Sequence, residues 1–303
     1  MNNMEEINTV VSESPKRNKL LSASIFTGAV IMAIAIIYVW GPQNGNAQKE
    51  TKTIAMEEIV PSKGVTLPAT WGDLGLRMVE AGVIDREKFD ALYEDRGGMS
   101  EDGKKLTYAS DNGNITITNE NAGEILNLLW ALGLSNKNEI LEQGIMSNPE
   151  YGGAERFAST GGWTLGDGDP MNHFSKHQFI MLTKEQQELV LKVAQNIYRP
   201  CCDNPTHFPD CNHGMAMLGL LELMASQGAT EDELYKAAFI VNSYWFPDHY
   251  QMIATYMESK GLDWDEVSPK EMVGKNFASG SAAAQLKAAI NPEEHKGSSS
   301  CGA

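Results

Sequence analysis

The stretch "TKEQQELVLKVAQNIYRPCCDNPTHFPDCNHGMAMLGLLELMAS", residues 183–226, decides the fold. Its first part has apolar residues at helical spacing, and Thr183 with Gln186 forms a capping-box pair that favours a helix start. Pro200 has to end this helix, because proline removes a helical hydrogen bond and clashes with the preceding turn. The last part, "MAMLGLLELMAS", is typical of a buried helix. The stretch therefore predicts two helices joined by a loop at 199–214.

Helical patterns continue after this pair. Thr230 with Glu233 repeats the capping box, and the apolar run that follows stops at Pro247. A β pattern occurs where "KLTYA" and "NITIT" flank an Asp-Asn-Gly turn, which predicts a hairpin at about 105–118. The fold class expected for residues 67–278 is therefore mainly α, a helical array with one small β-hairpin.

An uncharged segment near the N-terminus predicts a membrane anchor. Residues 20–40 form a run of 21 residues without a charge, which spans ~31 Å as a helix, about the thickness of a bilayer's hydrocarbon core. Basic residues precede it, so residues 1–19 should stay in the cytoplasm and the rest should be extracytoplasmic. We expect a signal anchor that crosses the cell membrane once. A cleaved signal peptide ending near Ala47 is the alternative, and it also exports the remainder.

Two segments around the domain have the composition of unstructured chain. Residues 41–66 are rich in Gly, Asn, Gln, Lys and Thr, which predicts a linker between the anchor and the domain. Residues 279–303 are rich in Ala, Gly and Ser, and we expect a flexible tail there, with one candidate short helix at "AAAQLKAAI", residues 282–290.

The charge balance limits the partners. The 24 basic and 40 acidic residues give a formal net charge of −16, and no basic cluster occurs beyond the N-terminus. Nucleic acid is therefore not an expected partner, because phosphate recognition needs clustered Lys and Arg. The expected partners are the membrane, through the single helix, and a protein at the membrane surface.

The loop at 199–214 holds three of the four cysteines in the chain. Outside the cytoplasm, thiols oxidise unless a metal or a reductant protects them. Two prolines stiffen the segment between Cys201-Cys202 and Cys211, so the cysteines should lie near one another and near His213. The N-terminus of the second helix favours the thiolate of Cys211.

These features predict a metal site in the loop. The expected ligands are Cys201, Cys202, Cys211 and His213, with His207 as a spare ligand. Sulfur-rich sets with one imidazole suit Zn(II), or Cu(I) where methionine joins, and the nearby methionines fit a core helix as well. The spacing matches no standard zinc signature, so the choice between Zn and Cu stays open.

A second histidine pair lies upstream of the loop. Asp169-Pro170 predicts the start of a short helix that would place His173 and His177 on one face. They are second-rank metal ligands in this interpretation, and partly buried histidines with backbone partners in the alternative one. The zincin protease motif needs Glu after the first histidine, but Phe174 stands there.

Two other functions remain open. A disulfide from Cys211 to Cys201 or Cys202 would stabilise a helical interaction module that tethers a partner at the membrane. A thiol-disulfide oxidoreductase would use the vicinal pair, with Cys301 on the tail as a second thiol. No general base or nucleophile stands out, so the sequence leaves open whether the chain is an enzyme. The function expected first is metal binding, transfer or sensing.

Overall fold

The structure is a computed structural model, and it describes residues 54–290. The expected cytoplasmic segment 1–19 and membrane anchor 20–40 lie outside these residues, as do residues 291–303 with Cys301. Among the helices of residues 54–290, none has both the length and the apolar character needed to cross a membrane.

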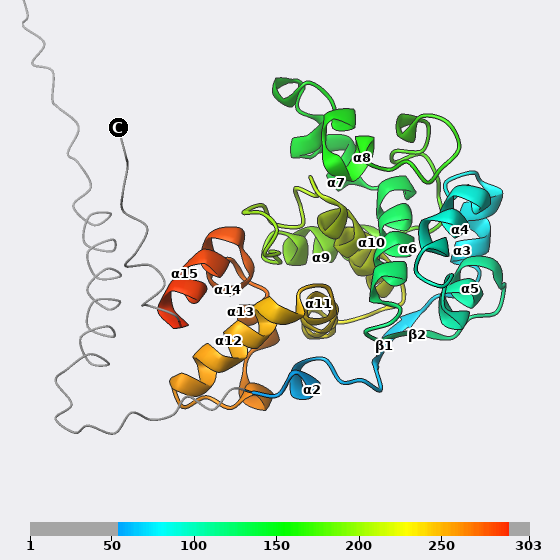
Figure 1. The fold of residues 1–303 in the computed structure, drawn as a ribbon. Helices are drawn as coiled ribbons and strands as arrows, with labels where there is room; N and C mark the ends of the chain where they lie inside the picture. The colour runs from blue at the N-terminus through cyan, green and yellow to red at the C-terminus, as the bar shows by residue number, and fades with distance from the viewer. Residues whose placement is uncertain (1–53, 291–303) are drawn as a thin grey trace, which may run out of the picture. The chain divides into compact units, whose positions relative to one another are not determined.

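The described residues form a mainly helical fold with one small antiparallel sheet, as the sequence predicts (Figure 1). The helices are α2 (Met56–Ile59), α3 (Leu74–Glu80), α4 (Arg86–Glu94), α5 (Glu101–Tyr108), α6 (Ala122–Ser135), α7 (Glu139–Gln143), α8 (Ala158–Gly161), α9 (Lys184–Ala194), α10 (Asn212–Ser226), α11 (Glu231–Trp245), α12 (Pro247–Ser259), α13 (Pro269–Met272), α14 (Lys275–Ala278) and α15 (Gly280–Ile290). Short 3-10 turns are η1 (Ile145–Ser147), η2 (Pro149–Tyr151), η3 (Ala154–Arg156), η4 (Pro170–Asn172) and η5 (Trp264–Glu266). The strands are β1 (Val65–Thr70) and β2 (Asn114–Ile117).

The centre of the fold is the packed pair α6 and α10. Every residue from 214 to 225 of α10 is buried, because this helix is apolar on all sides. Gly133 of α6 and Gly219 of α10 meet where the two backbones cross. A Cβ atom on Gly133 would lie 2.0 Å from the Met215 carbonyl oxygen, and one on Gly219 would lie 2.5 Å from that of Leu129. Only glycine permits this approach of the two helices.

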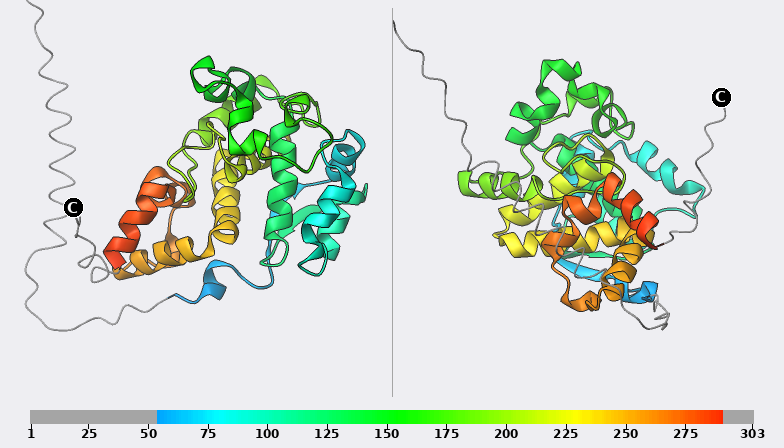
Figure 2. Two further views of the ribbon diagram at one scale, coloured as in Figure 1. Left: turned by 45° about the horizontal axis from the view of Figure 1, so that its top comes forward. Right: turned by 90° about the vertical axis from the view of Figure 1, so that its left-hand side faces the viewer.

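The other helices pack on both sides of this pair. In Figure 1 and in the left view of Figure 2, α3 to α5 lie beside α6, and α12 to α15 lie on the opposite side, beyond α10 and α11. The predicted capping boxes are present: Thr183 and Gln186 begin α9, and Thr230 and Glu233 begin α11. Pro247 is the first residue of α12, where its missing N–H costs nothing.

The sheet differs from the predicted hairpin in its first strand. The second strand, β2, lies where expected, but it pairs antiparallel with β1, with Val65 opposite Ile117. The segment expected as the first strand, 105–109, is instead the end of α5. Ser100 caps that helix by accepting a hydrogen bond from the backbone N–H of Gly103. A local capping signal therefore prevailed over the alternating pattern.

The folded region extends beyond the predicted bounds at both ends. Ile54, Ile59 and Val60 are buried, so part of the expected linker 41–66 belongs to the domain. The start of the expected tail is helix α15, which contains the candidate short helix at 282–290. Its first turn is held by the loop, because the Asp203 carboxylate accepts a 2.8 Å hydrogen bond from the Ser281 N–H. Negative charge at a helix N-terminus is favourable, so the loop and this helix stabilise each other.

Candidate metal centre

The cysteines lie in the loop that connects α9 to α10. Helix α9 ends at Ala194, before the position that Pro200 would dictate, because the returning loop satisfies its last carbonyl groups. The His207 N–H donates to the Ala194 carbonyl oxygen at 3.0 Å, and the Thr206 N–H donates to that of Ile197 at 2.8 Å. These bonds fold the two prolines and the cysteines back against the end of α9.

Arg199 organises the loop from inside. Its side chain is 1% exposed and donates hydrogen bonds to the carbonyl oxygens of Asn204 (2.9 Å) and Phe208 (3.2 Å), to the Asp210 carboxylate (2.6 Å) and to Cys211 Sγ (3.0 Å). A guanidinium group presents five N–H donors in a rigid plane, so one side chain can fix four points of a loop. The loop is therefore built around a buried cation.

Gly214, in the first turn of α10, makes room for this cation. A Cβ atom at this position would lie 2.5 Å from the Arg199 guanidinium. The glycine lets the guanidinium lie directly against the helix, where it reaches Cys211, the N-cap residue of α10. The start of α10 and the fixed position of Cys211 thus depend on the same contact.

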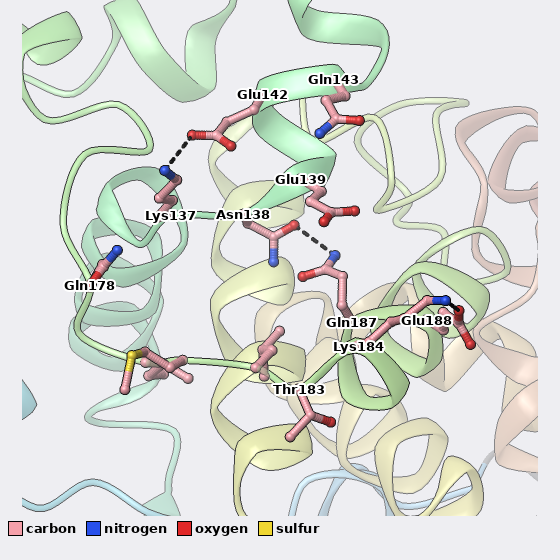
Figure 3. Close-up of a pocket in the computed structure, with 13 residues that line it drawn as sticks. Lys137, Asn138, Glu139, Glu142, Gln143, Gln178, Thr183, Lys184, Gln187 and Glu188 are labelled. Carbon is pink, nitrogen blue, oxygen red and sulfur yellow. Dashed lines mark hydrogen bonds and ion pairs between the residues drawn. The ribbon is translucent and has the colours of Figure 1, made fainter.

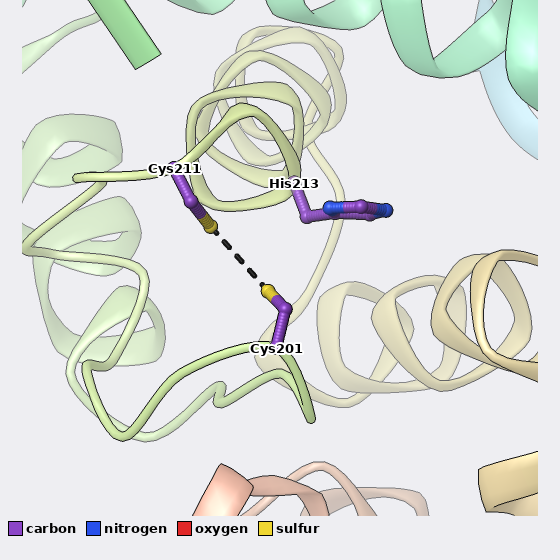
Figure 4. Close-up of side chains that lie close together, drawn as sticks. All are labelled: Cys201, Cys211 and His213. Atoms are coloured by element: carbon purple, nitrogen blue, oxygen red, sulfur yellow. Dashed lines mark hydrogen bonds between the residues drawn. The ribbon is translucent and has the colours of Figure 1, made fainter. Parts of the chain in front are cut away.

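Two sulfur atoms face each other across the loop opening. The Cys201 and Cys211 sulfurs are 3.6 Å apart, and Figure 4 shows them pointing toward one another from the loop and from α10. Both are free thiols. Two thiolates bound to one tetrahedral zinc ion, with bonds of ~2.3 Å, have sulfurs about 3.8 Å apart. The separation matches a shared metal ion with only a small adjustment.

His213 supplies the third ligand atom. A ring nitrogen of His213 and the sulfurs of Cys201 and Cys211 all lie within 4.8 Å of one another. The imidazole extends to one side of the sulfur pair (Figure 4), and its centroid lies 4.5 Å from the Phe246 ring and 5.7 Å from the Trp245 ring. These aromatic rings limit the freedom of the imidazole, which favours metal binding.

The electrostatics of the loop make Cys211 the thiolate of the group. Hydrogen bonds from Cys201 and Cys202 lower the pKa of the Cys211 thiol, and His213 and the Arg199 cation lower it further. Hydrogen bonds with Cys202 and Cys211, together with burial, raise the pKa of the Cys201 thiol. A sulfur that favours the thiolate, beside a thiol that keeps its proton, is a soft donor set for a cation.

Cys202 and Asp210 form a second group with Cys211 on the inner side of the loop. Their ligand atoms also lie within 4.8 Å of one another. The Cys202 sulfur lies 3.9 Å from an Asp210 carboxylate oxygen, and that same oxygen accepts the hydrogen bond from Arg199. The carboxylate of this inner group is therefore already paired with a guanidinium cation, which also donates to the Cys211 sulfur that both groups share. The outer group, Cys201, Cys211 and His213, contains no carboxylate.

The remaining predicted ligands lie elsewhere. His207 belongs to neither group, although it is in the loop. His173 and His177 do contact each other, with Nδ1 and Nε2 3.0 Å apart and stacked rings. They are not on one helix as predicted, because η4 stops at Asn172 and Ser175 has a left-handed backbone with φ of 54°.

The histidine pair is satisfied without a metal. The second His173 nitrogen lies 3.0 Å from the Asp167 carbonyl oxygen, which can only accept a hydrogen bond. In a neutral His173, Nδ1 is then the acceptor and His177 the donor. Burial lowers the pKa of His177, with the neighbouring His173 adding to the effect, so the neutral form of His177 is favoured. This arrangement agrees with the structural alternative for these histidines.

Sequence reasoning missed two members of the site, Arg199 and Asp210. Both stand beside the cysteines in the sequence, at Arg-Pro-Cys-Cys and Asp-Cys, where opposite charges flank the two ends of the loop. This pair of opposite charges was the signal in the sequence that Arg199 and Asp210 could interact. It did not predict that Arg199 is buried, since arginine is rarely buried unless it is paired.

A polar cavity lies away from the cysteines. Its volume is about 610 Å³, and it is lined by α7, residues 178–183 and the start of α9. Figure 3 shows Asn138 at its base, where the side-chain oxygen accepts a 3.1 Å hydrogen bond from Gln187. Asn138 is also a side-chain neighbour of Glu222 of α10, whose burial raises its carboxyl pKa well above the usual range. The lining residues include no cysteine or histidine, so this cavity is separate from the candidate metal centre.

Comparisons with protein-family models, curated proteins and solved structures find no match to this chain.

Proposed function

We propose that this protein binds one soft or borderline metal ion, Zn(II) or Cu(I), through Cys201, Cys211 and His213. The observation that supports this most directly is the 3.6 Å approach of two free thiols beside an imidazole in a loop fixed by a buried arginine. The role would be metal binding, transfer or sensing. Three protein ligands leave a coordination position for solvent or for a donor from a partner.

The proposal assigns different roles to the two vicinal cysteines. Cys201 is exposed and faces Cys211, so it is the second sulfur ligand. Cys202 faces inward toward Asp210, where Arg199 already supplies the positive charge. Cys211 belongs to both groups, and its sulfur also accepts the 3.0 Å hydrogen bond from Arg199, so the two groups share one donor atom. The expected stoichiometry is therefore one ion per chain.

Elemental analysis of the purified full-length chain, loaded with Zn(II) or Cu(I) and freed of excess metal, tests this assignment. We expect about one ion per chain in the unchanged protein, and loss of bound metal in Cys211→Ser and in Cys201→Ser. Cys202→Ser is the matched control, because it removes the adjacent sulfur and should keep the metal. His213→Ala should weaken binding by at least about 10-fold, the usual effect of losing a ligand or its support.

Three results would overturn the assignment. Retention of metal in Cys211→Ser would show that the shared sulfur is not a ligand. Loss of metal in Cys202→Ser together with its retention in Cys201→Ser would place the ion on the inner side, beside Arg199. A metal content near zero in the unchanged chain under reducing conditions would remove the proposed function itself.

We further propose that residues 20–40 anchor the chain in the cell membrane and place this site outside the cytoplasm. An uncharged run of 21 residues preceded by basic residues supports this topology. A thiol reagent that cannot cross membranes should label Cys201 in intact cells that produce the full chain. Labelling that appears only after lysis would show the opposite orientation, and release of the chain by alkaline washing would show that it is not anchored.

A further inference from the structure

Besides holding a metal, the sulfur pair can close on itself. We propose that Cys201 and Cys211 form a reversible disulfide by exchange with a small-molecule disulfide, and that closure and metal binding exclude each other. The second half of this proposal rests on the proposed function. The disulfide itself does not, because it can be tested in protein stripped of metal.

The two sulfurs differ in accessibility, which sets the order of the reaction. Cys201 is exposed, whereas Cys211 is half-buried behind it, at the N-cap of α10. An incoming disulfide can reach Cys201 first. Cys211 then faces the Cys201 sulfur from 3.6 Å, which is a short step from the bonded distance of about 2.05 Å.

The exchange occurs in two balanced steps. First, the one proton of the pair passes from Cys201 to Cys211 across their contact, and the Cys201 thiolate attacks the small-molecule disulfide: a mixed disulfide forms on Cys201, the original sulfur–sulfur bond breaks, and one thiolate leaves. Second, that thiolate takes the proton from Cys211, and the Cys211 sulfur attacks Cys201: the bond between Cys201 and Cys211 forms, the mixed disulfide breaks, and a second thiolate leaves. The pair loses two electrons and its one proton, and the reagent gains both, ending as one thiol and one thiolate.

The geometry distinguishes this pair from the vicinal pair that the sequence suggests. The Cys202 sulfur points toward the Asn204 carbonyl oxygen and the Asp210 carboxylate, each 3.9 Å away. Cys201 instead faces Cys211 across the loop opening (Figure 4). Closure between Cys201 and Cys211 spans the two ends of the loop and leaves Cys202 as a thiol.

Closure would also release a bound metal. Both sulfurs of the outer group are consumed, and a disulfide sulfur is a far weaker ligand than a thiolate. Only His213 would remain of the three proposed ligands. The loop would then switch between a reduced form that holds the ion and an oxidised form that does not.

The first experiment uses the full chain, stripped of metal and reduced, then exposed to oxidised glutathione. We expect intact mass to fall by two hydrogen atoms and peptide mapping to link Cys201 with Cys211. Cys202→Ser should close in the same way, whereas Cys211→Ser should keep glutathione on Cys201. A lasting glutathione adduct in the unchanged chain, a link through Cys202 or Cys301, or no reaction would each overturn the disulfide proposal.

The second experiment repeats the exposure with one equivalent of Zn(II) bound. Closure should slow by at least 10-fold relative to the stripped chain, and zinc should appear in solution as the disulfide forms. Closure at an unchanged rate with zinc retained would overturn the mutual exclusion. If the chain binds no zinc but still closes, the metal proposal fails and the disulfide stands, so the two failures can be told apart.

Discussion

Arg199 is the residue on which the shape of the cysteine loop depends. It joins two carbonyl oxygens, a carboxylate and a sulfur, and its side chain is only 1% exposed. Arg199→Lys keeps the charge but loses the planar set of donors. We expect the free energy of unfolding of the metal-free chain to fall by about 1.5–3 kcal/mol, the scale of hydrogen bonds to charged groups.

Urea denaturation measures this change. Arg96→Lys is the matched control, since Arg96 is exposed, and surface substitutions usually stay within about 0.5 kcal/mol. Equal stability of the two variants would show that the guanidinium geometry is unimportant. Arg199→Lys should also slow closure of the disulfide, because Cys211 loses the donor that holds it in place.

Glu222 gives the stability a dependence on pH. Burial raises its carboxyl pKa in the folded state, so the folded chain keeps a proton that the unfolded chain releases above about pH 4.3. Stability from this group is therefore fully present below that pH and is lost as the pH rises toward the raised pKa. The loss amounts to about 1.4 kcal/mol per unit of difference between the two pKa values.

Glu222→Gln removes this titration while keeping the shape of the side chain. Its amide can still face Asn136, whose Nδ2 donates to the carboxyl group at 2.8 Å. In the unchanged chain, Glu222 lowers the free energy of unfolding as the pH rises above about 4.3. We expect Glu222→Gln to lack this contribution when urea denaturation is measured from about pH 4 to 8. Glu139→Gln, at an exposed position of the cavity rim, should follow the unchanged chain. Parallel profiles for all three proteins would contradict the assignment to Glu222.

The sequence could predict which cysteines lie near one another in the loop, but not which direction each cysteine side chain takes. Two prolines and two helix ends bring Cys201, Cys202 and Cys211 together, as expected. Adjacent residues in an irregular loop can point to either side, so no pattern showed that Cys201 faces the opening and Cys202 faces Asp210. That choice depends on the position of Arg199, which only the folded loop defines.

At the scale of elements, the crossing of α6 and α10 brings two helix backbones into direct contact. Gly133→Ala would place a methyl group 2.0 Å from the Met215 carbonyl oxygen. The clash is with backbone, so relieving it would require the two helices to shift at a cost in free energy. We expect the free energy of unfolding to fall by about 3 kcal/mol or more, as in overpacked cores. Gly219→Ala should have a similar effect, since its Cβ would meet the backbone of α6.

Gly123→Ala is the control for this crossing. It lies in the same helix, α6, but nothing lies within 4 Å of the position that its new methyl group would take. Alanine favours helix over glycine by about 0.5–1 kcal/mol, so this variant should be unchanged or slightly more stable. Thermal and urea denaturation of the three variants measure the difference. Equal behaviour of Gly123→Ala and Gly133→Ala would mean that the helices can separate without cost.

The elements with strong capping signals were predicted well, and the strand pairing was not. Thr183 and Thr230 start their helices as expected, because a capping box is a local interaction. The partner of β2 lies far away in the sequence, at β1, and a local pattern cannot show it. The predicted helix at His173 and His177 failed for a related reason. The His177 backbone pairs with the end of α6, and Ser175 turns the chain to reach it.

For the whole molecule, the helical class follows from composition and periodicity, but the neighbours of the loop do not. The loop lies against α15, where the Gly280 N–H donates to the Cys202 carbonyl oxygen at 2.9 Å and Asp203 holds the Ser281 N–H. The segment 279–290 has the composition of a low-complexity tail, and only its short run at 282–290 indicates a helix, because small residues carry little periodic signal. Contacts with the loop, α12 and α14 hold this helix in place, so a change in the loop should change the stability of the C-terminal helices.

Metal binding should therefore raise the stability of the whole domain. A ligand that binds only the folded state stabilises it by mass action, by about 2.7 kcal/mol when free metal exceeds Kd roughly 100-fold. We expect Zn(II) to raise the melting temperature of the reduced chain, and a chelator to reverse the change. Cys202→Ser should respond like the unchanged chain. Cys211→Ser and the closed disulfide should not respond, because both lack the sulfur pair at 3.6 Å. A shift in melting temperature of equal size in Cys211→Ser would show that the stabilising ion binds somewhere other than this loop.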